Sequence, residues 1–171
     1  MSLWDDFVEL SQTVFAPLEE SFGFQRRPPT RPFVHYDSSS LQISFFYDCS
    51  RDHELDVAFR RKADVGTQKP SYGLSSLMAI HDPAAWETYV SSFPNDKHAL
   101  KSSLLAMKDL LFRYGASLIA GDESDLGKCD ELEKQVAAEF GRSDSSGDYK
   151  SRVRQVILRF HKNAESGRRG D

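Results

Sequence analysis

The sequence predicts a single α+β domain that has an N-terminal helix, a three-stranded antiparallel meander and an all-helical C-terminal half packed on the sheet. Alternation of apolar and polar residues with a period of two is confined to residues 33–61. Apolar residues spaced three or four positions apart precede and follow that block, which is the spacing of amphipathic helices. Because 171 residues suit one domain, we expect it to occupy residues 1–165, followed by a polar tail at 166–171.

The N-terminal segment is expected to be a helix with Ser2 as a candidate N-cap. Pro17 should kink or end it, because proline inside a helix removes a hydrogen bond and clashes with the preceding turn. The apolar residues that share one face of this helix are Leu3, Phe7, Leu10, Val14 and Leu18.

Strand-like runs are expected at residues 33–37, 41–48 and 55–61. The segments between them, 38–40 and 49–53, are short and polar enough to be hairpin turns, so sequential antiparallel pairing is the simplest topology.

Five further helical segments are expected after the sheet, separated by proline, glycine and serine-rich breaks. Asn95 is a candidate N-cap for the longest of them, and Gly141 should close the acidic helix before a joint at 143–147. The predicted helices cover residues 74–80, 84–93, 96–120, 126–140 and 149–160.

Composition and charge restrict the function classes. The net charge of −4 argues against a dedicated nucleic-acid binder, although an acidic segment at 122–139 is followed by a basic one at 148–171. The N-terminus lacks a secretory signal pattern, no apolar run is long enough to span a membrane, and Cys49 and Cys129 lack metal or redox spacing. We therefore expect a cytoplasmic protein without a membrane partner.

No motif assigns a catalytic residue, a metal ligand or a cofactor. The five histidines form no HxH or HExxH pattern, and the glycines form no phosphate-binding loop. Cys49 and His53 share one predicted turn and could bring a thiol near an imidazole, but an ordinary turn explains them. Asp48 and Asp52 at the same hairpin could do acid/base chemistry, but two acids four positions apart are common by chance.

Exposed binding surface is the more informative feature. Phe46 is the one large apolar residue on the polar side of its strand, where either a helix covers it or it anchors a partner. The acidic segment has the charge density to oppose a basic surface, with a solvated helix face as the simpler explanation. The candidate partner-binding residues are Phe46, Asp48, Arg51, Asp52, Glu131 and Glu133.

The runs "LQISFFYD", "ELDVAFRRK" and "YGLSSLM", followed by the long helix "HALKSSLLAMKDLLFRYGASLI", resemble a loose class of small uncharacterised bacterial α+β proteins. Some of these are similar to immunity proteins encoded beside polymorphic toxins. The resemblance implies a cytoplasmic inhibitor that binds a toxin domain, and it transfers no functional residue.

The leading hypothesis is thus a non-catalytic protein-binding module, in its sharpest form an immunity-type inhibitor with a toxin domain as partner. One alternative is a nucleic-acid-associated regulator that uses the basic C-terminal helix. Another is an enzyme with an unrecognised site, which would show a pocket with convergent polar groups. The sequence leaves the oligomeric state open.

Overall fold

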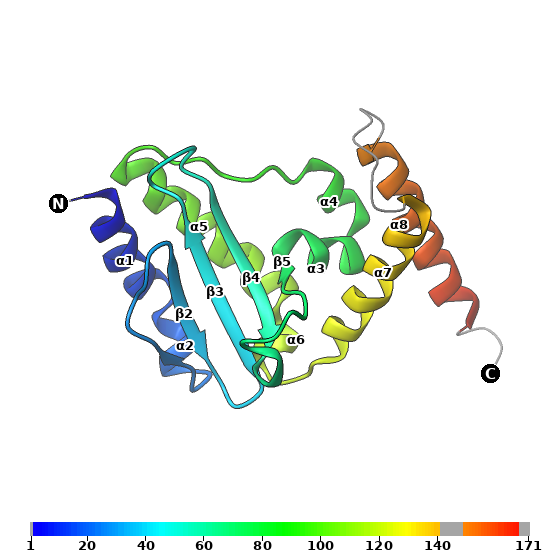
Figure 1. Ribbon diagram of the computed structural model, residues 1–171, viewed down its shortest axis with the longest axis horizontal. Coiled ribbons are helices and arrows are strands. Elements are labelled where there is room, and N and C mark those ends of the chain that lie inside the picture. Colours follow the sequence, from blue (N-terminus) through cyan, green and yellow to red (C-terminus); the bar gives the residue numbers. More distant parts are fainter. Residues whose placement is uncertain (1, 141–148, 168–171) are drawn as a thin grey trace. The chain divides into compact units, whose positions relative to one another are not determined.

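The computed structural model describes residues 2–140 and 149–167, and it confirms the α+β class with an antiparallel sheet (Figure 1). The chain forms two compact units. The first comprises Met1–Leu74 and Val90–Glu123 and contains the sheet; the second comprises Ser75–Tyr89 and Ser124–Asp171 and is helical where it is described.

The sheet has five antiparallel strands in the order β1-β2-β3-β4-β5, where the sequence predicted three. The two additional strands contain two residues each and lie at the edges, too short for a periodic pattern to reveal them. The strands are β1 (Gln25–Arg26), β2 (Phe33–Asp37), β3 (Leu41–Tyr47), β4 (Leu55–Arg61) and β5 (Tyr72–Gly73). A short 3-10 helix, η1 (Lys62–Asp64), follows β4.

The N-terminal helical segment is divided at the point where Pro17 was expected to act. Helix α1 (Leu3–Val14) ends before Phe15, and α2 (Ala16–Glu20) carries Pro17 in its first turn, where a missing N–H costs nothing. Ser2 caps α1 as predicted: its hydroxyl accepts from the Asp5 amide, and the Asp5 carboxylate accepts from the Ser2 amide at 2.8 Å.

One face of the sheet, here called the inner face, forms the core of the first unit. Figure 1 shows α1 and α5 behind β2, β3 and β4. Phe15 stacks on Phe45 with ring centroids 3.9 Å apart, and the Tyr36 hydroxyl donates to the Ser11 carbonyl at 3.3 Å. The inner-face residues are almost fully buried: Val34, Tyr36, Leu41, Ile43, Phe45, Tyr47, Leu55, Val57 and Phe59.

The long helix expected at 96–120 is two helices, α5 (Lys97–Tyr114) and α6 (Ala116–Ile119), interrupted at Gly115. A Cβ atom on Gly115 would lie 2.8 Å from the Leu111 carbonyl oxygen, so the break requires glycine. The expectation of Asn95 as the cap is wrong: the Asp96 carboxylate accepts from the Ala99 amide at 2.8 Å.

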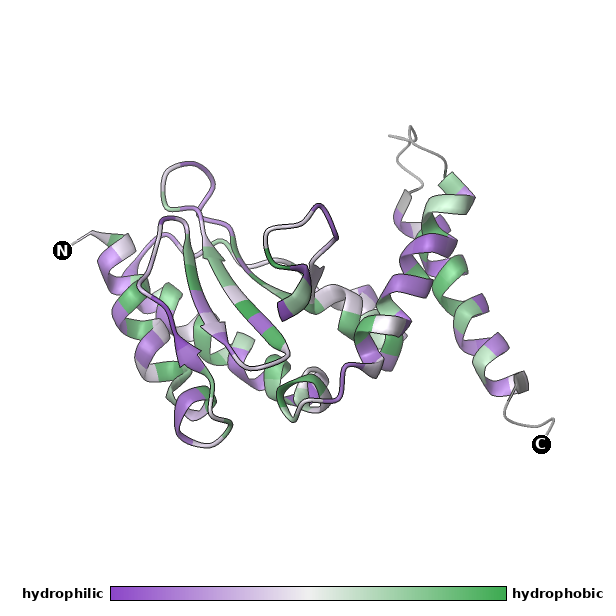
Figure 2. Cartoon of the chain, turned by 60° about the horizontal axis from the view of Figure 1, so that its bottom comes forward, coloured by the Kyte–Doolittle hydropathy of each residue, from purple (hydrophilic) through white to green (hydrophobic). Residues whose placement is uncertain are grey.

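The described helices of the second unit are most of α3 (Leu74–His81), α4 (Pro83–Thr88), α7 (Ser124–Phe140) and α8 (Tyr149–Gly167). The Asp82 side chain caps α4 by accepting from the Ala85 amide at 3.0 Å. Gly141 and the predicted joint at 143–147 lie outside the described residues, as does the predicted tail beyond Gly167. Hydrophobic and hydrophilic residues interleave along the strands and helices (Figure 2). Among the described helices, none is long and apolar enough to cross a membrane.

Candidate functional site

The sheet face opposite the core, here called the outer face, carries aromatic, hydroxyl and charged side chains. The strand register places them in three cross-strand rows. The rows are Phe33, Phe46 and Asp56; His35, Ser44 and Ala58; and Asp37, Gln42 and Arg60.

An aromatic pair defines a pocket of about 270 Å³ on this face. The rings of Phe33 and Phe46 lie 5.4 Å apart and are tilted, and Phe33 also stacks on His35 at 5.4 Å. Phe46 is only half-buried. The long helices of the first unit lie on the inner face, so within this unit no long helix covers Phe46. The pocket is lined by Phe33, Ser44, Phe46, Glu54, Asp56, Val57 and Ala58, and we call it the aromatic pocket.

Two carboxylates border the aromatic pocket. Burial raises the pKa of Asp56 above its ordinary value, and the nearby charge of Glu54 raises it further. The Asp56 carboxylate accepts a hydrogen bond from the Val57 amide at 2.7 Å. Among the residues that the structure describes, neither Asp56 nor Glu54 forms an ion pair. This end of the outer face therefore combines aromatic surface with uncompensated negative charge.

His35 and Ser44 form a hydrogen-bonded pair on neighbouring strands. The His35 Nδ1 atom lies 2.8 Å from the Ser44 Oγ atom, and burial lowers the pKa of His35, which keeps the imidazole neutral at pH 7. A serine nucleophile also needs N–H donors aimed at a developing oxyanion. Ser44 lies in β3, which is paired on both sides, so the backbone amides around it donate to neighbouring strands. His35 and Ser44 therefore fit a binding surface better than a site for acyl transfer.

The loop residues proposed from the sequence lie in the β3–β4 hairpin. Asp48 accepts from the Ser50 hydroxyl at 2.7 Å and the Ser50 amide at 2.9 Å, and these bonds lower the pKa of Asp48. Arg51 and Asp52 are exposed in the same turn. Asp48 thus stabilises a turn and does not border the aromatic pocket, although it lines a smaller pocket of about 220 Å³ beside the half-buried thiol of Cys49.

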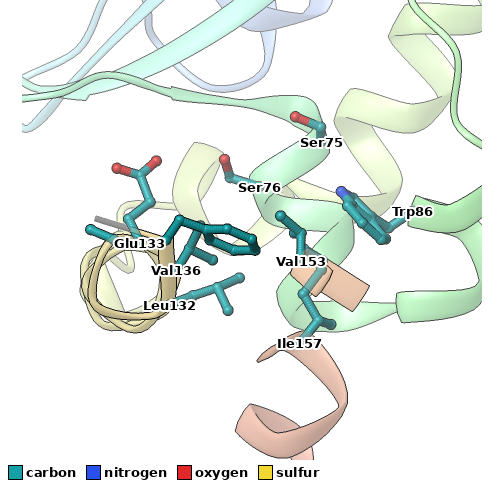
Figure 3. A pocket seen from close by; sticks show the side chains of 11 residues that line it. Ser75, Ser76, Trp86, Leu132, Glu133, Val136, Val153 and Ile157 are labelled. Atoms are coloured by element: carbon teal, nitrogen blue, oxygen red, sulfur yellow. The ribbon is translucent and has the colours of Figure 1, made fainter. Parts of the chain in front are cut away.

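The second unit contains its own pocket, of about 400 Å³, to which α3, α4, α7 and α8 contribute (Figure 3). Its lining is mainly apolar, and its polar side-chain groups are the Ser75 and Ser76 hydroxyls, the Glu133 carboxylate and the Trp86 indole N–H. Burial raises the pKa of Glu133, and the Asp130 charge contributes. Glu131 is exposed and accepts from the Gln135 amide at 3.1 Å. The structure therefore places Glu133 at a pocket and Glu131 on a solvated helix face.

The basic C-terminal helix α8 is engaged with acidic neighbours in its own unit. Arg159 donates to the Glu139 carboxylate at 2.8 Å, and Arg154 pairs with Glu87. Arg152 lies 4.4 Å over the Phe140 ring. These contacts account for much of the basic charge without a nucleic acid.

No group of three or more potential metal ligands is present among the described residues. In comparisons with family models, curated proteins and solved structures, nothing matches this chain. The chemistry of the described side chains is thus the basis for a functional conclusion.

The sequence predicted Phe46 as an outward-facing residue but did not reveal Phe33, His35 and Glu54 as its companions on the outer face. Phe33 and His35 belong to a five-residue strand, and Glu54 directly precedes β4. The signal that could have found them is the antiparallel register, which pairs Phe33 with Phe46 and His35 with Ser44 once the turn at 38–40 is fixed.

Proposed function

We propose that this protein is a non-catalytic protein-binding module, in its sharpest form an immunity-type inhibitor of a bacterial toxin domain, and that the aromatic pocket receives an arginine or lysine side chain of the partner. The observation that carries the proposal is the pair Asp56 and Glu54, without an ion-pair partner among the described residues, beside the rings of Phe33 and Phe46.

Physical chemistry favours a cationic occupant. Moving a carboxylate out of water is unfavourable unless an opposite charge compensates it, and the raised pKa of Asp56 reports that cost. An arginine can lie against an aromatic ring while it donates to a carboxylate, so one side chain satisfies both parts of the pocket. Aromatic anchors surrounded by polar groups are also the usual centre of a protein interface.

A toxin that acts on nucleic acid would present such cations, because its active site must hold phosphates. An inhibitor that supplies carboxylates to that surface blocks substrate binding and associates rapidly through electrostatic attraction. The acidic end of the outer face therefore suits the inhibitor role that the sequence resemblance implies, and such an inhibitor needs no chemistry of its own.

The first test is a nuclear magnetic resonance titration of the protein with acetyl-arginine amide, using acetyl-citrulline amide as the uncharged control ligand. We expect resonances of Phe33 and Phe46 to shift with the arginine compound alone. The double variant E54Q/D56N should abolish the shifts, while E131Q, which changes an exposed acid of the second unit, should retain them.

The second test is co-purification with the product of the adjacent gene, followed by calorimetry. Phe46→Ala should weaken the complex at least ten-fold, which corresponds to about 1.4 kcal/mol and is typical of an interface anchor. Equal affinities of the wild type, Phe46→Ala and E54Q/D56N for this protein would contradict the proposed binding face. Equal shifts with the arginine and citrulline compounds would contradict a cationic occupant.

A further inference from the structure

A further pocket of the first unit, of about 480 Å³, lies at the end of the sheet where β1 and β2 pair and the β2–β3 turn begins. It shares no lining residue with the aromatic pocket. Its lining is cationic and hydroxyl-rich: Gly23, Gln25, Arg26, Arg27, Pro28, Asp37, Ser38, Ser39 and Lys62. We call it the basic pocket.

Three separate segments form the pocket, and two of them supply its cations. Gly23, with a φ of 70°, turns the chain after α2 so that β1 can pair with β2, which places Arg26 opposite Tyr36. The Arg27 amide donates to the His35 carbonyl at 3.0 Å. Lys62 arrives from the end of β4, where its amide donates to the Ser40 carbonyl at 2.6 Å.

Asp37 holds two of the cations in place. Its carboxylate accepts from Arg27 Nε and Lys62 Nζ, and Gln42 donates to its other oxygen at 2.9 Å. Burial alone would raise the pKa of Asp37, but the hydrogen bonds from Lys62, Gln42 and Arg27 outweigh it and hold that pKa below its ordinary value. The anchor therefore stays ionised and keeps both cations oriented at neutral pH.

Arg27 and Lys62 each have N–H donors that Asp37 does not use. A guanidinium has five N–H groups and an ammonium has three, and Asp37 uses the Nε–H of Arg27 and one N–H of Lys62. No other side-chain hydrogen bond of Arg27 or Lys62 occurs among the described residues, and their side chains are 49% and 31% exposed. Four donors on Arg27 and two on Lys62 thus remain for a ligand.

The local charge balance is positive. Arg26, Arg27 and Lys62 face one carboxylate inside the basic pocket, and Glu19 lies 3.8 Å from Arg26 without lining the pocket. Ser38 uses its hydroxyl to close the turn, accepting from the Leu41 amide at 3.0 Å, whereas Ser39 is exposed at the rim. When Glu19 is counted with Asp37, the three cations leave one excess positive charge. This charge and several oriented donors match a phosphate, which accepts bidentate bonds from guanidinium.

We propose that the basic pocket binds the phosphate monoester group of a soluble small molecule, with Arg27 and Lys62 as the binding residues and Asp37 as the residue that positions them. The pocket volume exceeds that of a phosphate group alone, so the remainder accommodates the molecule that carries it.

The test is calorimetry at low salt with phosphoserine, using serine as the matched ligand that lacks the phosphate. We expect saturable binding of phosphoserine and of inorganic phosphate, and none of serine. R27Q and K62Q should each weaken phosphoserine binding at least ten-fold. Each single variant leaves Asp37 with one cation fewer, so R27Q/D37N and K62Q/D37N test the same positions without an under-compensated carboxylate. They should weaken binding at least as much, because they also remove the residue that positions the other cation, and circular dichroism checks that they fold.

The control variant is R51Q, which removes an exposed arginine from the β3–β4 hairpin and should leave the affinity within two-fold of the wild type. The proposal is overturned if the wild type binds neither phosphoserine nor inorganic phosphate, or if R51Q weakens binding as much as R27Q/D37N does. It is equally overturned if a short RNA binds with Arg27 dependence while both small phosphates fail, since the site would then serve a polyanion.

Discussion

Phe45 and Phe46 are adjacent in β3 and point to opposite faces of the sheet, so the same substitution at each position measures the two faces. Phe45 is fully buried, stacks on Phe15 at 3.9 Å and meets Tyr36 edge-on at 5.7 Å. Phe45→Ala should therefore lower the free energy of unfolding by about 3–5 kcal/mol, the usual cost of removing a buried phenyl ring. Phe46 is half-buried and has the Phe33 ring at 5.4 Å, so Phe46→Ala should cost about 1 kcal/mol.

Urea unfolding followed by tryptophan fluorescence provides the measurement. The chain has two tryptophans, and in a Trp86→Phe background the remaining Trp4 reports the first unit, because it lies 5.4 Å from Phe7 in the core. The midpoint should fall strongly for Phe45→Ala and slightly for Phe46→Ala, with unchanged slopes. Equal losses at the two positions would refute the two-face reasoning, because Phe46 would then have to be packed as a core residue.

Three further substitutions follow from single contacts. Asp96→Ala removes the cap of α5 and should lower the free energy of unfolding by about 1 kcal/mol, whereas Asn95→Ala, one residue earlier, should leave it unchanged in the same urea experiment. The Ser11 hydroxyl is fully buried without a hydrogen-bond partner among the described atoms, so Ser11→Ala should leave stability equal or raise it by about 1 kcal/mol, and a loss above that size would indicate a missing partner. Folding raises the pKa of Asp56, so ionisation of this carboxyl destabilises the fold as pH rises above about 4. Asp56→Asn should therefore raise the free energy of unfolding more at pH 7 than at pH 3. An equal rise of the urea midpoint at pH 7 and pH 3 would contradict this assignment.

The sequence predicts the elements whose pattern is long and whose caps are local. The period-two runs located β2, β3 and β4, and the Ser2 cap and the break near Pro17 were predicted from residue type alone. The interruption at Gly115 was missed because Leu111, Tyr114 and Leu118 keep a helical spacing across it. Apolar periodicity indicates which face of a helix is buried, but it does not reveal an interruption of the backbone within a single turn.

Site residues were harder to predict because they come together through pairing between strands. Phe46 could be singled out as apolar on a polar face, but its companion Phe33 lies thirteen positions earlier and is reached only through the register of β2 against β3. The cluster around Asp37 needs three segments at once, including Arg27 directly after β1, a strand of only two residues. The sequence also suggested Asp48 and Asp52 as partner-binding residues, but they belong to a hairpin turn. Carboxylates in turns often accept hydrogen bonds from backbone amides, as Asp48 does from the Ser50 amide.

The aromatic pocket and the basic pocket differ in how their charge is balanced, and the proposed ligand of each is inferred from this difference. Asp56 and Glu54 lack a cation among the described residues, so binding energy is available to a partner that brings one. Asp37 has two cations and a hydrogen bond from Gln42, so adding a further cation there gains nothing, while an anion meets donors that are already oriented. The opposite ligand charges that we propose for the two ends of the sheet rest on whether each carboxylate is already compensated. Charge-neutralising substitutions at Asp56 and at Arg27 should therefore affect the two proposed binding reactions separately.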